Sequence, residues 1–241
     1  MRHSNYAEAD RILTIYTRDH GKLKVIAKGI RKIQSRKAGH LEPFTYSTIQ
    51  LARSHELPII SQAETVLGFP NIHADLDRTA QAALVIELLD RFTFEAEHNS
   101  LLFGLVIDTL KRLDASEDSF LPVKYYEIHL LDSLGYKPEL FACSICRKEI
   151  KAEDQFFSAQ HGGVVCPGCG KTHTDCRPIT MDALKYLRHL QRSTYTEASR
   201  ANPNPLVRGE MDDLLNYYFD FLLERGLNST RFIREIHNLM E

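Results

Sequence analysis

The five cysteines of this chain are the residues best suited to bind a metal, and all of them lie between positions 143 and 176. Four form two CxxC pairs, Cys143 with Cys146 and Cys166 with Cys169, and nineteen residues separate the pairs. Each pair lets two thiolates converge, and together they supply the tetrahedral sulfur set that zinc prefers. Four protein ligands leave no open coordination position. We therefore expect one structural Zn²⁺ per chain, with an iron–sulfur centre or a disulfide pair as alternatives.

The segment around these cysteines, residues 141–177, is too polar to build a core of its own. Metal binding supplies the missing folding free energy in segments of this kind. Cys176, His161 and His173 lie in or next to the same segment, but a complete set of four thiolates leaves them no ligand role.

Basic residues near the N-terminus are the second group with a chemical implication. The first forty residues contain 10 Lys/Arg against 3 Asp/Glu, whereas residues 71–241 contain 19 against 26. A basic segment joined to an acidic body is typical of a module that binds a polyanion. Aromatic residues interleaved with it, Tyr16, Phe44 and Tyr46, could stack on unpaired bases. The alternative is an ordinary solvated face. The candidate DNA contacts are Lys22, Lys24, Lys28, Arg31, Lys32, Arg36 and Lys37.

Short strands are predicted throughout the first seventy residues. Residues 11–17 and 22–28 are rich in β-branched and alternating apolar residues, and Gly21 between them suits a tight hairpin turn. A polar, basic loop follows at residues 29–39, and two further strands are predicted at 45–53 and 58–66. Strands this short and numerous favour a small antiparallel barrel over an open sheet.

Helical periodicity begins near residue 76 and predicts an α-helical body. Apolar residues recur at helical spacing over residues 77–97, and Asn99 is placed to cap a second helix that ends at about 113. A third helix is expected over residues 119–134. Beyond the cysteine segment, Thr180 can cap a helix to about 191. A mobile loop is expected over 193–205, and the last helices are expected from about 211 to 226 and from 229 onward.

Signals for catalysis are missing from the sequence. It contains no GxxxxGK[ST], GxSxG or HExxH motif and no GxGxxG after a strand, and its histidines are scattered without partners at ligand spacing. We therefore predict no catalytic residues and no enzyme activity. The longest nearly uninterrupted apolar run, residues 101–107, is far shorter than the roughly 20 residues of a membrane span, and no leader peptide is recognised. The expected location is the cytoplasm.

Several segments taken in order resemble the RecO family, the bacterial recombination mediators of gap repair. Residues 6–11 and 17–23, which read YAEADR and TRDHGKL, are similar to the opening hairpin of that family. Residues 27–32 with Ser35 and Arg36 resemble its basic signature, and residues 130–138 before Cys143 resemble its junction between helix and zinc element. Only five residues precede Tyr6, so the first strand is expected to be short or missing.

This resemblance implies an α+β protein: an N-terminal OB-fold barrel over residues 1–75, then a helical domain over 76–241 with a four-cysteine zinc element inserted at 141–177. It implies binding to single- and double-stranded DNA, annealing of complementary strands, and partnership with RecR in loading RecA. It further implies docking of the C-terminal tail of single-stranded DNA-binding protein on the helical domain, and association with the nucleoid during repair. The resemblance assigns DNA contacts to Lys28, Arg31, Lys32, Arg36 and Lys37.

Two other classes of function remain open from the residues alone. A zinc ribbon could belong to a scaffold that binds RNA or a transcription or translation partner, and preference for RNA over single-stranded DNA would identify it. A metal-dependent nuclease would need clustered carboxylates for hard cations, and the sequence offers no convincing set.

Overall fold

The computed structural model describes residues 1–224 and 226–240, and the chain divides into two compact units. Unit 1 consists of Met1–Ser116 with Glu235–Glu241, and unit 2 consists of Glu117–Arg234. The first two long helices after the strands therefore belong to the same compact unit as the sheet. The predicted functional division near residue 75 stays a prediction, and each unit is described by itself.

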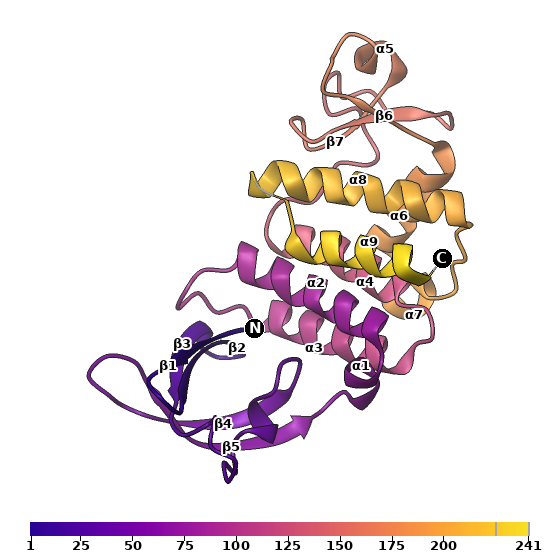
Figure 1. Cartoon of the computed structure of the whole chain (residues 1–241). Coiled ribbons are helices and arrows are strands. Elements are labelled where there is room, and N and C mark those ends of the chain that lie inside the picture. The colour runs from indigo at the N-terminus through magenta and orange to yellow at the C-terminus, as the bar shows by residue number, and fades with distance from the viewer. Residues whose placement is uncertain (225, 241) are drawn as a thin grey trace. The chain divides into compact units, whose positions relative to one another are not determined.

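Unit 1 is built on a five-stranded sheet that curls strongly (Figure 1). Its strands are β1 (Arg2–Tyr6), β2 (Asp10–Thr17), β3 (Gly21–Ala27), β4 (Tyr46–Ala52) and β5 (Ile59–Leu67), in the order β1-β2-β3-β5-β4. All neighbours are antiparallel except β3 and β5. This is the arrangement of a partly open barrel of the OB type, which confirms the predicted α+β fold class and its strand-rich start.

The hairpin of β2 and β3 forms where alternation predicted it. Thr17 pairs with Gly21, and Gly21 has a φ of +61°, which favours glycine. The inward-facing residues of the hairpin join β5 and the following loop in one core, which consists of Leu13, Val25, Ala27, Ile30 and Ile60. The hairpin therefore fixes the start of the basic loop relative to the sheet.

Strand β1 is short, as expected, and all five of its residues are exposed. It pairs with β2 along its whole length. Among the residues that the structure describes, no backbone ladder joins β1 to β4. The barrel is thus open between its first and fourth strands.

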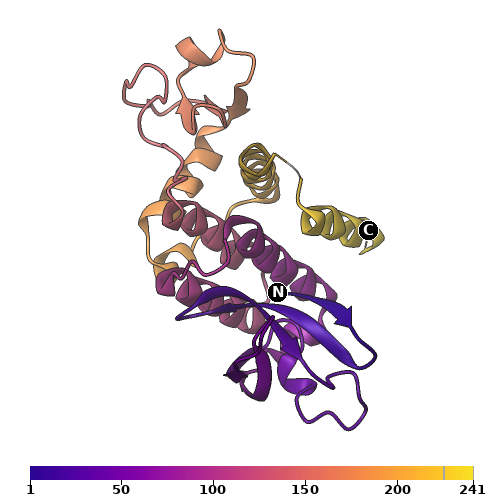
Figure 2. The same ribbon diagram turned by 90° about the vertical axis from the view of Figure 1, so that its left-hand side faces the viewer.

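The sheet is followed in unit 1 by α1 (Pro70–Ala74), α2 (Leu76–Phe92) and α3 (Ser100–Ala115), and the end of the last helix, from Glu235, also belongs to this unit. Asn99 caps α3 through a bond from the Leu102 N–H, as predicted. The two long helices run side by side in both views (Figures 1 and 2). Helix α2 ends five residues before the predicted limit because the Ala96 N–H donates to the Lys22 carbonyl and Glu95 forms a strand-like bridge to Lys22. Pairing with β3 thus replaces the last helical turn.

Unit 2 contains α4 (Phe120–Ser133), α6 (Met181–Arg192), α7 (Tyr195–Ala198), α8 (Pro205–Leu223) and the first part of α9 (Asn228–Met240). The predicted cap of α6 is confirmed, since the Thr180 side chain accepts from the Ala183 N–H. The loop predicted before α8 contains α7, because Thr194 and Glu197 form a capping box that starts a helical turn.

A buried group of charges joins α4 to α8. The Lys124 ammonium, which is buried, lies 2.5 Å from a carboxylate oxygen of Glu127 and 2.7 Å from one of Asp212. Glu127 is also buried, whereas Asp212 is partly exposed. Burial disfavours the charged form of Lys124, but the two carboxylates outweigh it and raise the pKa of Lys124 above its usual value.

The cysteine segment between α4 and α6 folds as a small separate sheet with one helical turn. Its strands are β6 (Gln155–Ser158), β7 (Gly163–Val165) and β8 (Arg177–Ile179), in the order β7-β6-β8, and α5 (Pro167–Gly170) follows β7. Phe157 of β6 packs edge-on against Tyr218 of α8, at 5.4 Å between ring centroids. Side-chain packing therefore connects this element to the helices of its own unit.

Candidate metal centre and nucleic-acid interface

The four cysteines of the two CxxC pairs come together at one point in unit 2. All four Sγ atoms lie within 4.8 Å of one another, and the sulfurs of Cys146 and Cys166 are 3.8 Å apart. A tetrahedral zinc with Zn–S bonds of about 2.3 Å needs sulfurs about 3.8 Å apart. The four side chains could hold a metal ion of this size and geometry.

Backbone hydrogen bonds fix both cysteine pairs in place. The Ser144 N–H donates to the Val164 carbonyl of β7 at 2.8 Å, which ties the first pair to the sheet. Cys166 caps α5, and the Gly170 N–H donates to the Cys166 carbonyl at 2.8 Å. The Cys166 N–H also points at the Cys143 sulfur, at 3.3 Å. The chain therefore presents its sulfurs from two rigid turns.

The electrostatics of the cluster favour a bound cation. Burial opposes ionisation of Cys143, but N–H groups of Cys146, Cys166 and Ile145 outweigh it and lower the pKa of Cys143 to about 6. The pKa of Cys169 is raised to about 12. The largest cause is a side-chain hydrogen bond with Cys166, and the negative charge of Cys143 acts in the same direction. Four thiolates so close together need a cation to ionise together.

The remaining candidates of the segment lie outside this group of sulfurs. Within the described residues, the clustered metal-ligating atoms belong to the four cysteines and to neither Cys176 nor the two histidines. His161 instead places Nδ1 at 3.0 Å from the Ser158 hydroxyl, which also bonds to the Asp175 carboxylate. That these residues are bystanders to the metal stays a prediction.

The seven predicted DNA contacts separate into two groups in unit 1. Lys28, Arg31, Lys32 and Arg36 are exposed, and they lie between the end of β3 and the short 3₁₀ helix η1 (Gly39–Leu41). Because they fall within nine consecutive residues, they form one basic loop. Contact of this loop with DNA stays a prediction.

The other three cations are held by groups of the protein itself, and Arg31 of the first group also donates from its guanidinium to the Glu8 carbonyl at 3.2 Å. The Lys22 ammonium lies 2.9 Å from an Asp90 carboxylate oxygen and donates to the carbonyls of Asp90 and Thr93 at 2.6 and 2.8 Å. Its side chain is only 14% exposed, so the prediction that it faces solvent is wrong. Lys24 pairs with Glu95 at 2.5 Å and remains half-exposed. Lys37 donates to the Ile60 carbonyl at 2.8 Å.

The aromatic residues expected to stack on bases are also used inside unit 1. The Tyr16 ring stacks on Phe103 of α3 at 6.3 Å between centroids, and Tyr46 meets the same ring edge-on at 5.6 Å. Burial raises the pKa of Tyr16. Sequence spacing carries no information on this contact, because Phe103 is almost sixty residues away from Tyr46.

Replacing Lys22 with methionine is expected to destabilise the protein and to leave the salt dependence of DNA binding unchanged. Asp90 is buried, and loss of the ammonium removes one of its partners, Arg2 being the other. We expect a loss of about 1–3 kcal/mol in the free energy of unfolding. Denaturant unfolding measures it. The matched control, Lys24→Met, breaks an exposed pair and should change stability by less than about 1 kcal/mol. Equal stability of the two variants would contradict the structural role of Lys22.

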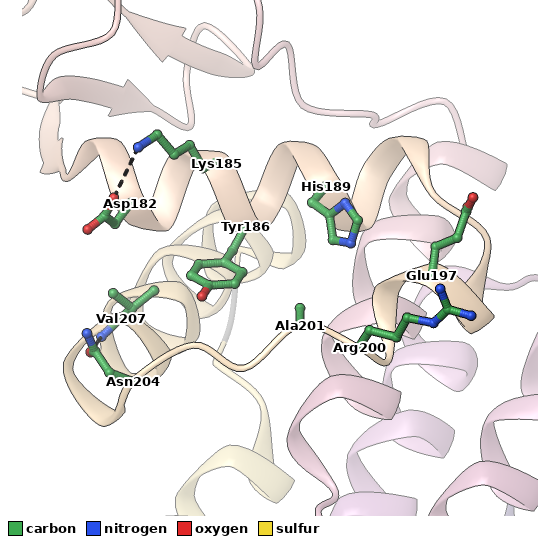
Figure 3. A pocket seen from close by; sticks show the side chains of 9 residues that line it. All are labelled: Asp182, Lys185, Tyr186, His189, Glu197, Arg200, Ala201, Asn204 and Val207. Carbon is green, nitrogen blue, oxygen red and sulfur yellow. Dashed lines mark hydrogen bonds and ion pairs between the residues drawn. The ribbon is translucent and has the colours of Figure 1, made fainter.

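A groove in unit 2 was not foreseen from the sequence. It encloses about 660 Å³, and Figure 3 shows side chains of α6, α7 and the start of α8 around it. Lys185 pairs with Asp182 at 3.4 Å, and the Glu197 carboxylate accepts from the Thr194 backbone and hydroxyl. Two acidic and two basic side chains therefore line the groove, and the structure pairs Lys185 with Asp182. The groove is lined by Asp182, Lys185, Tyr186, His189, Glu197, Arg200, Ala201, Asn204 and Val207.

A partly open five-stranded barrel with a basic loop, followed by helices that carry a four-cysteine element, defines a two-part α+β protein with an OB-type barrel. Family models identify it further. Residues 1–69 match the model for the N-terminal part of recombination protein O, and residues 73–231 match the model for its C-terminal part. The chain belongs to the RecO family.

Curated relatives agree with this assignment. The chain is 37% identical over 225 residues to the DNA repair protein RecO of Dehalococcoides mccartyi strain 195, which covers 93% of this chain and 88% of the relative. It is 35% identical over 240 residues to the DNA repair protein RecO of Roseiflexus sp. strain RS-1, and the match covers 100% of this chain and 84% of the relative. It is 30% identical to the DNA repair protein RecO of Bacillus pumilus, and this match covers 99% of this chain and 93% of the relative. No helix within residues 1–224 or 226–240 has the length and apolar character to cross a membrane.

Proposed function

We propose that this chain is a DNA repair mediator that acts by binding and not by catalysis. The observation that carries the proposal is the basic loop, in which four exposed cations lie within nine residues. Phosphate groups require such a concentrated positive field, and their neutralisation releases counterions. Membership of a family whose relatives are named DNA repair proteins supports the same role.

Annealing of complementary strands is the activity that we infer for the chain. The loop would screen the repulsion between two strands and hold them close enough to pair, which needs no covalent chemistry. We further infer binding to both single- and double-stranded DNA, cooperation with RecR in loading RecA, and recruitment by the C-terminal tail of single-stranded DNA-binding protein. A cytoplasmic location, at the nucleoid during repair, follows from these partners.

A structural zinc ion completes the proposal. We infer Zn²⁺ at Cys143, Cys146, Cys166 and Cys169 because soft thiolates in a tetrahedral set suit this metal and leave it no open position. Its task is to hold the small sheet of β6, β7 and β8 in its folded form. This assignment gives the metal no part in chemistry on DNA.

The direct test uses complementary oligonucleotides coated with single-stranded DNA-binding protein. Adding this chain should convert them to duplex, and gel electrophoresis separates the two forms. A matched pair of RNA strands serves as the control and should anneal no faster than without the chain. If the chain binds the RNA strands as tightly as the DNA strands, the alternative of an RNA-binding scaffold is favoured. If the chain binds the DNA but does not anneal it, the mediator role is contradicted.

A further inference from the structure

One apolar residue, Ile33, is fully exposed within the basic loop. Ile33 exposes 105% of its reference accessible surface, so its side chain touches almost nothing in the protein. The cations Arg31 and Lys32 precede it and Arg36 follows it. Attraction of phosphates is electrostatic, and a large aliphatic side chain among the charges of the loop adds nothing to it.

Hydrogen bonds at both ends of the loop hold Ile33 away from the sheet. On one side, Ile30 is buried in the core of the barrel, and the Gly29 N–H donates to the Asp10 carboxylate at 2.7 Å. On the other side, the Lys37 ammonium donates to the Ile60 carbonyl at 2.8 Å. The residues between these anchors form a short arm whose first part is tied to the turn after β1, since the Arg31 N–H donates to the Ala9 carbonyl at 3.0 Å and the Arg31 guanidinium donates to the Glu8 carbonyl at 3.2 Å.

Two consecutive turns stiffen this arm. The Lys32 N–H donates to the Gly29 carbonyl at 3.1 Å, and the Ser35 N–H donates to the Lys32 carbonyl at 2.9 Å. Ile33 lies within the second turn, so its outward position follows from an internally bonded backbone. Because its backbone is already ordered, the arm loses little further conformational entropy when a ligand binds.

We propose that Ile33 is a wedge that enters between adjacent bases of bound DNA while the cations beside it hold the phosphates. Apolar wedges of this kind unstack a base step, and electrostatic contacts to the neighbouring phosphates compensate the cost. The inference rests on the proposed DNA binding by the loop and adds to it a residue that separates bases. A mediator that anneals strands benefits from a group that keeps bases unstacked at the point of pairing.

Charge complementarity is the reason for choosing DNA as the occupant. Leu101 at the start of α3 is also highly exposed, at 83%, but has no lysine or arginine within five residues on either side. Scattered exposed apolar residues of that kind are normal and need no ligand. Ile33 differs because the charges around it select a polyanion, and the apolar surface of a polyanionic strand consists of its bases.

The test measures base unstacking in a forked duplex that carries 2-aminopurine beside the fork, since the fluorescence of this base rises when it leaves the stack. The wild-type chain should raise the fluorescence on binding. Ile33→Ala should reduce the rise at least threefold and weaken binding about fivefold, because less aliphatic surface is buried against the bases. Its salt dependence should match that of the wild type, because no charge is lost. Leu101→Ala, the same kind of truncation at an exposed site of unit 1, should change none of these quantities.

The outcomes separate the wedge from the proposed function on which it rests. Binding by the wild-type chain without a rise in fluorescence would overturn the wedge and leave the DNA-binding role intact. A full rise with Ile33→Ala would overturn it as well. Failure of the wild-type chain to bind the fork at low salt would remove the proposed function itself. Ile33→Leu should preserve the fluorescence rise, which excludes a local folding defect as the cause of the alanine result.

Discussion

Replacing Cys143 and Cys146 together with serine is expected to remove about one zinc ion per chain and to unfold residues 141–177. The small sheet of this segment is joined to a metal site that binds with an apparent free energy of about 10–16 kcal/mol in isolated zinc elements. Without thiolates on one side of the cluster, the remaining two ligands cannot hold the ion. Metal analysis of the purified protein measures the loss, and hydrogen exchange of β6 and β7 measures the unfolding.

Cys176→Ser is the matched control for this experiment. It removes a thiol from the same segment but from outside the sulfur cluster, so the zinc content and the exchange of β6 should match the wild type. Loss of zinc from this variant would show that the ligand set is wrong. A wild-type protein that is fully folded without metal would contradict the structural role of the ion.

Changing Lys28, Arg31, Lys32 and Arg36 together to alanine is expected to weaken binding to single-stranded DNA on the order of a thousandfold at 50 mM salt. Each phosphate contact contributes about 0.7 to the slope of log K against log salt concentration. Loss of four contacts should therefore flatten that slope by about 3. Fluorescence anisotropy across a salt titration measures both quantities. Lys37 is left in place because its ammonium holds the Ile60 carbonyl and its loss would disturb the barrel.

A second quadruple variant provides the control for the change in net charge. Lys111, Lys151, Lys185 and Arg200 are exposed, and replacing them with alanine alters the total charge by the same amount. If the basic loop is the contact surface, this variant should keep a slope close to that of the wild type. An equal loss of slope in both variants would mean that general charge, and not the loop, attracts the DNA.

Local patterns in the sequence were sufficient to predict most elements that bear on the site. Alternation over residues 22–28 predicted β3. Asn99 caps α3 and Thr180 caps α6, as their side chains led us to expect. The spacing of the cysteines likewise predicted the cluster, because a CxxC pair determines its own geometry within four residues. Each of these features depends on neighbours that are close in the chain.

Features that depend on distant residues were missed or misread. Lys22 and Lys24 share a face of β3 as predicted, but that face meets Asp90 and Glu95, which follow almost seventy residues later. The same encounter ended α2 early. The short strands β6, β7 and β8 of the cysteine segment were not predicted, because three or four residues show too little periodicity in the sequence. Ile33 could have been found, since an aliphatic residue inside a basic run is visible in the sequence.

The charges buried between α4 and α8 have a consequence for how unit 2 comes apart. If the helices separate fully, Lys124 and Glu127 stay paired within α4 and water reaches them, so no buried charge is left unpaired. Sliding one helix along the other by a single turn would instead leave these two charges buried without Asp212, with a penalty of several kcal/mol, so intermediate registers are suppressed. The two helices, about eighty residues apart in the chain, are thereby expected to melt in one cooperative step.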